Sequence, residues 1–159
     1  MMPVMEIDVL VDEAFEGKVS ADWLKGVARL VLEAEGADPT AAMSLVITGQ
    51  DEIRQLNAVH LGEDGPTDVL AFPLQPDEDE EDGFILPPDG AVHLGEVIIS
   101  YPQAEIQAGE RGQPVQRELA VLLVHGVLHL LGYDHDTPER EARMKAREAA
   151  LLARLEAVP

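Results

Sequence analysis

The sequence predicts a single α+β domain over residues 1–159, in which a small mixed sheet of about four strands is covered by helices. The first observation is that four short stretches show the polar-apolar alternation or the β-branched residues typical of strands. The second is that three helical stretches follow one another after residue 100, so strands and helices do not strictly alternate. The third is that 159 residues, 46% of them hydrophobic, suffice for one compact core.

The predicted strands differ in pattern. Residues 5–11 alternate polar and apolar side chains, as a strand with one buried face does. Residues 42–48 and 92–100 are rich in β-branched residues, which fit a pleated sheet. A shorter strand is predicted over residues 68–72, directly before Pro73.

Local signals mark the ends of several predicted helices. Ser20 suits the N-cap of one helix, and Gly36 suits its end. Thr137 and Pro138 suit the cap and the first position of the last helix. The predicted helices cover residues 21–35, 51–59, 101–109, 114–131 and 138–157.

The segment HGVLHLLGYDH holds three of the five histidines of the chain. In a helix over residues 114–131, His125 and His129 lie one turn apart on one face, so both imidazoles can converge on one ion. Gly132 can end the helix in the left-handed conformation and let His135 arrive as a third ligand. Because this helix is apolar on more than one side, we expect the metal site to lie on a central, buried helix.

Three protein ligands leave one coordination position of the metal open. Structural zinc is usually closed by four protein ligands, often thiolates, and this chain has no cysteine. An ion held by three neutral imidazoles lowers the pKa of bound water to about 7 and can polarise a phosphoryl or carbonyl oxygen. We therefore expect a catalytic metal site and hydrolytic chemistry. Imidazole suits zinc, nickel, copper and iron, so the ligands by themselves do not identify the metal.

The histidine spacing also occurs in metzincin proteases, whose signature is HExxHxxGxxH. The protease motif places its general base, a glutamate, directly after the first histidine, where this chain has Gly126. A peptide hydrolase of that type is therefore disfavoured. Glu118 and Asp134 are carboxylates near the site, but neither is assigned as the base, and the general base stays unknown.

Several further stretches carry a recognisable pattern together with HGVLHLLGYDH. They are Leu56 and Asn57, PTDVLAFP at Pro66 to Pro73, LGEVIIS at Leu94 to Ser100, and RELAVLLVHG at Arg117 to Gly126. In this order, the stretches resemble the YbeY family of bacterial ribosomal RNA maturation factors, and they span most of the chain from about residue 45 to 145.

The resemblance implies a metal-dependent, single-strand-specific endoribonuclease that acts in 16S rRNA 3′-end maturation and ribosome quality control. It implies one zinc ion on His125, His129 and His135. Its implied partners are single-stranded or ribosomal RNA, the small ribosomal subunit and assembly factors. Thr67 and Asp68 either line the RNA cleft beside the metal or serve as a turn and cap, since both residue types are common in turns.

One departure from the family pattern concerns the turn after Leu56 and Asn57. The family usually carries a tyrosine and then an arginine there, and the matching positions in this chain are His60 and Leu61. Without that arginine, the metal is the only identified electrophile for phosphoryl transfer. An alternative function is therefore a non-catalytic ribosome assembly factor that retains its metal site.

Net charge argues against RNA binding, because 11 basic and 31 acidic residues give −20. The negative charge is concentrated, since residues 61–100 contain no lysine or arginine. Six adjacent acids, DEDEED at 77–82, predict a solvated surface loop.

The sequence also predicts a cytoplasmic protein with no membrane partner. No apolar run approaches the length of about 20 residues that crosses a bilayer, and the N-terminal segment has acids where a signal peptide is basic.

Overall fold

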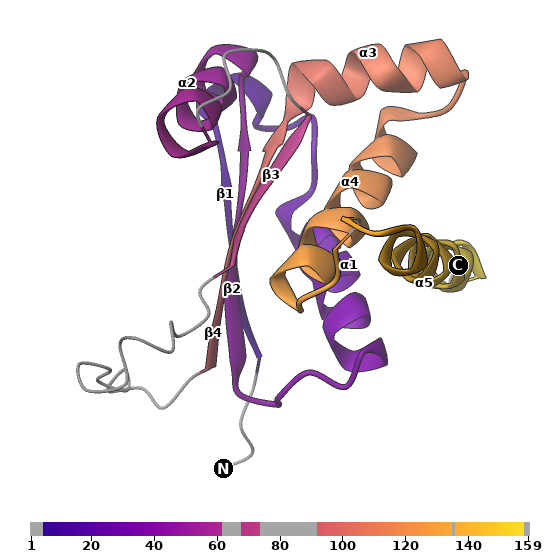
Figure 1. The fold of residues 1–159 in the computed structure, drawn as a ribbon. Coiled ribbons are helices and arrows are strands. Elements are labelled where there is room, and N and C mark those ends of the chain that lie inside the picture. Colours follow the sequence, from indigo (N-terminus) through magenta and orange to yellow (C-terminus); the bar gives the residue numbers. More distant parts are fainter. Residues whose placement is uncertain (1–4, 62–67, 74–91, 135, 158–159) are drawn as a thin grey trace.

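The computed structural model describes residues 5–61, 68–73, 92–134 and 136–157. Four strands and five α-helices lie in this part of the chain, with helices on both sides of the sheet (Figure 1). A short 3₁₀ helix, Glu13–Phe15, follows the first strand. The predicted α+β arrangement with a mixed sheet is confirmed.

The sheet has the strand order β1-β2-β4-β3. The parallel strands β1 (Glu6–Val11), β2 (Ala41–Thr48) and β4 (Val92–Ser100) form one side of it. The edge strand β3 (Val69–Pro73) pairs with β4 in the antiparallel direction. The sheet is therefore mixed, and β4 lies between a parallel and an antiparallel neighbour.

Alternation along β4 divides its side chains between two hydrophobic clusters. Val97 and Ile99 are fully buried in the main core, between the sheet and the helices α1 (Ala21–Ala34) and α4 (Val115–Leu130). Ile98 points to the other face. The main core therefore lies on the side of the sheet that carries α4.

The helix α2 (Gln50–Leu61) covers part of the opposite face. Ile53 is fully buried and forms a small cluster with Leu70 of β3 and Ile98 of β4. This helix is longer by one residue at its start and two at its end than the predicted 51–59.

The helices α3 (Tyr101–Arg111) and α5 (Pro138–Ala157) complete the layer around α4 (Figure 1). The predicted end of α3 at Gly109 is wrong, because Gly109 stays helical and Gly112 takes the left-handed conformation with φ 63°. A glycine forms this kind of helix end only where its backbone takes a positive φ, and a glycine that keeps a helical φ continues the helix. The other helices and strands agree with the predictions to within one residue at each end.

No helix in the described part of the chain is both long and apolar enough to span a membrane. The predicted acidic surface loop at 77–82 lies outside the described residues.

Candidate metal centre on α4

The end of α4 adopts the glycine-based motif that the sequence predicted. Gly132 has φ 100°, and its backbone N–H donates to the carbonyl oxygen of His129 at 3.1 Å. The N–H of Tyr133 donates to the carbonyl of Leu128 at 3.0 Å, which completes a Schellman motif. The motif satisfies carbonyl groups at the helix end and turns the chain sharply after the second histidine.

His125 and His129 present the same ring nitrogen to one another. Their Nε2 atoms are 3.2 Å apart, and the ring planes are inclined by 76°. Two nitrogen ligands of tetrahedral zinc, with Zn–N bonds of about 2.05 Å, lie about 3.3 Å apart. The separation of the two imidazole nitrogens therefore fits a shared cation, as it also fits a hydrogen bond between the rings.

The third predicted ligand, His135, lies outside the described residues. Within the described ranges, no cluster of three histidine, cysteine or acidic side chains has the geometry to hold a metal. The three-histidine site and its zinc therefore stay predictions. The described part of the chain contains the two predicted ligands on α4 and the turn that follows them.

The other ring nitrogen of His125 contacts a carboxylate on α5. Its Nδ1 lies 2.8 Å from Oε1 of Glu148, and both side chains are partly buried. The sequence gives no sign of this contact. The two residues are 23 positions apart on different helices, so no local spacing signals their pairing.

Gly126, next to His125, lies against the sheet. A Cβ atom at this position would be 2.6 Å from Cγ1 of Val97 and 3.5 Å from Cγ2 of Val69. Carbon atoms in contact ordinarily lie about 3.5 to 4.0 Å apart, so even a methyl group does not fit. The position that bears the protease base in metzincins is here in contact with the sheet, so it has no room for a glutamate side chain.

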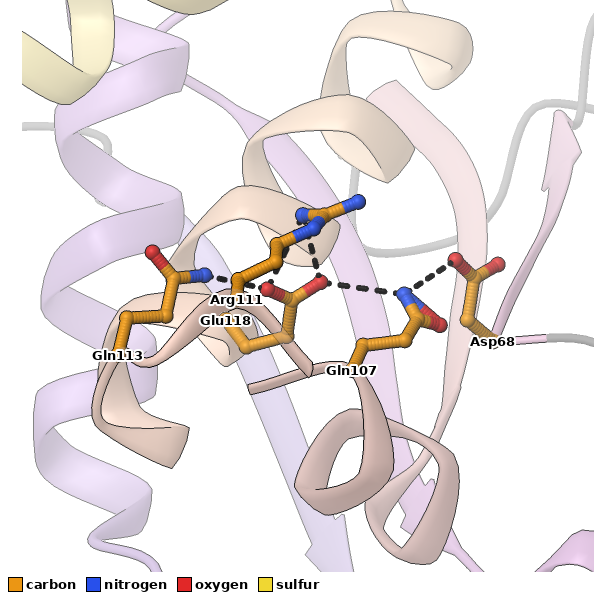
Figure 2. A network of polar contacts seen from close by, with 5 residues as sticks. All are labelled: Asp68, Gln107, Arg111, Gln113 and Glu118. Atoms are coloured by element: carbon orange, nitrogen blue, oxygen red, sulfur yellow. Dashed lines mark hydrogen bonds and ion pairs between the residues drawn. The ribbon is translucent and has the colours of Figure 1, made fainter. Parts of the chain in front are cut away.

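Of the two predicted substrate residues, Thr67 lies outside the described residues and Asp68 directly precedes β3. The carboxylate of Asp68 accepts a hydrogen bond from Nε2 of Gln107 on α3 at 3.2 Å. The same amide nitrogen donates to Glu118 of α4 at 3.1 Å (Figure 2). Asp68 is therefore tied to a buried polar network, and an RNA-contacting role stays a prediction.

Glu118 is the centre of that network and is completely buried. Arg111 Nη1 lies 3.1 Å from both of its carboxylate oxygens, and Gln113 donates to it at 2.5 Å (Figure 2). Because its oxygens are occupied by donors, Glu118 has a structural role that joins α3 to α4. This supports leaving Glu118 unassigned as a base.

A second carboxylate, that of Glu35, is hydrogen-bonded to the turn after α4. Glu35, the C-cap of α1, accepts hydrogen bonds from the hydroxyl of Tyr133 at 2.5 Å and from Nε of Arg147 at 2.9 Å. Burial alone would raise the pKa of Glu35, but these hydrogen bonds and the charge of Arg147 lower it below its ordinary value. The hydrogen bond to Glu35 in turn raises the pKa of Tyr133. The turn that leads to His135 is thereby tied to both α1 and α5.

A hollow of about 450 Å³ lies beside this turn. Arg140 on its wall is paired with Asp136 at 3.1 Å. Its lining comes from the end of α4 and the start of α5, namely Leu131, Gly132, Tyr133, Asp134, Arg140 and Arg143.

Comparison with known protein families gives a match along nearly the whole chain. A family model described as endoribonuclease YbeY matches residues 10–156. The chain belongs to this family. The resemblance that the sequence motifs indicated is thus confirmed.

Curated relatives and a solved structure agree with this assignment. The endoribonuclease YbeY of Dehalococcoides mccartyi is 53% identical over 148 residues, covering 91% of this chain and 92% of the relative. That of Moorella thermoacetica is 46% identical over 137 residues, covering 86% and 87%. The solution structure of TM1509 from Thermotoga maritima is similar with a TM-score of 0.57 and 26% identity, covering 96% of this chain and 93% of that one.

The departure from the family pattern falls at the end of α2. His60 and Leu61 are the last two residues of this helix, and the segment that follows, 62–67, lies outside the described residues.

Proposed function

We propose that this chain is a metal-dependent endoribonuclease specific for single-stranded RNA. It acts in the 3′-end maturation of 16S rRNA and in ribosome quality control, with one zinc ion on His125, His129 and His135. The observation that supports the metal is the 3.2 Å approach of the two Nε2 atoms on α4. The substrate class is supported by the endoribonuclease names of the relatives.

In this proposal, the residues of the chain hold and orient the ion. The helix α4 supplies two ligands from one rigid element. Because Gly126 has no side chain, this helix packs directly against the sheet. The Schellman turn at Gly132 and the hydrogen bond from Tyr133 to Glu35 direct the chain toward the third ligand. When bound, zinc supplies Lewis acidity and a water molecule of lowered pKa.

The acidic net charge does not exclude RNA, because the surface near the proposed site carries arginines. Arg143 is exposed and lines the hollow beside the turn after α4, where Arg140 is also present but paired with Asp136. Guanidinium groups suit phosphate, and local positive charge acts within about 8 to 10 Å at moderate ionic strength. We therefore propose that RNA approaches the metal from the start of α5.

The test is cleavage of single-stranded RNA by the purified protein, with and without a chelator. We expect cleavage that the chelator abolishes and added zinc restores, with little cleavage of a duplex of the same sequence. His129→Ala should lose the activity, whereas the control His93→Ala, at an exposed position on β4, should keep it. Cleavage that survives both the chelator and His129→Ala would refute the metal-dependent mechanism.

A second candidate is a non-catalytic ribosome assembly factor, which Leu61 at the family's arginine position favours. It predicts zinc binding and copurification with small ribosomal subunits, without chelator-sensitive cleavage. A peptide or small-substrate metallohydrolase is disfavoured, since Gly126 has no room for a glutamate side chain. Either ribosomal function would place the protein in the cytoplasm.

A further inference from the structure

Glu148 is a carboxylate on the side of α5 that packs against the core. Met144 and Leu151, one turn before and about one turn after it, are almost completely buried in the main core. Glu148 therefore occupies a stripe of the helix where an apolar residue would otherwise be expected. From there, it contacts Nδ1 of His125 at 2.8 Å.

This contact determines which nitrogen of His125 carries the proton. An ionised carboxylate only accepts hydrogen bonds, so Nδ1 of a neutral His125 must be the donor. The lone pair is then on Nε2, which is the atom that faces His129 at 3.2 Å. By holding the proton on Nδ1, Glu148 leaves the lone pair of His125 on Nε2, the nitrogen that a metal would use.

Other contacts fix Glu148 in place. The neighbouring Arg147 forms an ion pair with Glu35, the C-cap of α1, and so ties this turn of α5 to α1. Burial of Met144 and Leu151 holds the same turns of α5 against the core. The carboxylate is therefore presented by a helix that is anchored on both sides of it.

We propose that Glu148 is a positioning residue that sets the tautomer and orientation of His125 for a divalent metal ion. The inference rests on the proposed function insofar as it requires a metal at the two histidines of α4. Carboxylates that hydrogen-bond to ligating histidines raise the basicity of the ligand, and their removal typically costs about 10- to 100-fold in metal affinity.

The experiment compares Glu148→Ala, Glu148→Gln and the control Glu139→Gln, an exposed glutamate in the first turn of the same helix. Zinc affinity is measured by competition with a chromophoric chelator. We expect about 10- to 100-fold weaker binding for Glu148→Ala and unchanged binding for Glu139→Gln. Glu148→Gln should show a smaller loss, because its amide oxygen still accepts from Nδ1 but carries no charge. Urea denaturation of each metal-free variant checks that the fold is kept.

A second readout does not depend on metal. Side-chain ¹⁵N NMR of the metal-free protein at about pH 8, where an ordinary histidine is neutral, reports which nitrogen of His125 is protonated. We expect the Nδ1–H form in the wild type and loss of this preference in Glu148→Ala.

The outcomes separate the inference from the proposed function. If the wild type binds zinc and Glu148→Ala binds it equally tightly, the positioning role is refuted while the function stands. Equal losses of affinity in Glu148→Ala and Glu139→Gln would also refute it, since a general loss of stability would then explain both. If the wild type binds no zinc, the proposed function fails, and an unchanged tautomer in Glu148→Ala would refute the role of Glu148 as well.

Discussion

Replacing Gly126 by alanine tests how closely α4 must approach the sheet. The new Cβ would lie 2.6 Å from Cγ1 and 3.1 Å from Cγ2 of Val97, whereas carbon contacts ordinarily begin at about 3.5 Å. Both methyl groups of Val97 are close and the side chain is completely buried, so a rotation exchanges one clash for another. Relief therefore requires α4 and β4 to separate by about 0.9 Å.

Two opposing terms set the magnitude. Alanine is favoured over glycine inside a helix by about 1 kcal/mol. Overpacking a core costs about 1 to 3 kcal/mol, and the upper end applies because a helix and a strand must both move. We expect Gly126→Ala to lower the free energy of unfolding by about 2 kcal/mol, which corresponds to roughly 4 to 8 °C in Tm for a chain of this size. Urea and thermal denaturation of the metal-free protein measure it.

The matched control is Gly26→Ala in α1, where a Cβ would meet nothing within 4 Å. This variant should gain up to about 1 kcal/mol from helix preference alone. Combining Gly126→Ala with Val97→Ala should cost less than the sum of the two single changes, because the clash is then removed. A Gly126→Ala variant as stable as Gly26→Ala would refute the packing argument.

Three further predictions concern the turn after α4 and the carboxylates of Glu118 and Glu35. Gly132→Ala and Gly36→Ala should each cost about 1 kcal/mol in urea denaturation, because both glycines end helices at positive φ, 100° and 70°. Gly132→Ala alone should also weaken zinc binding, and equal zinc affinities in the two variants would contradict this. Glu118→Ala should lower the free energy of unfolding by about 3 kcal/mol, since Arg111 and two amide donors lose their acceptor, and a loss below about 1 kcal/mol would contradict its central role. Because the pKa of Glu35 is lowered in the folded state, its stabilisation is present above its ordinary value of 4.5 and is lost as pH falls through the folded pKa. The stability advantage of the wild type over Glu35→Gln should accordingly shrink below pH 4.5 in urea denaturation, and a constant advantage would contradict it.

The elements of the fold were predictable where local patterns are strong. The alternation in residues 5–11 and the β-branched run before Ser100 correspond to β1 and β4. The end of α3 was not predictable, because Gly109 and Gly112 are equally plausible stops by sequence. Only the backbone conformation shows that Gly112 takes the positive φ.

The same division holds for the candidate site. The spacing of His125 and His129 and the glycine after them fix two imidazoles on one helix face and a turn behind them, because helical periodicity is a property of the local backbone. The residues that surround these two imidazoles were decided by packing between segments distant in the sequence. Glu148 contacts His125 from another helix. The helix α4 lies so close to Val97 that position 126 has no room for a side chain. Such contacts depend on which faces of the finished layers meet, and no short window of sequence contains that information.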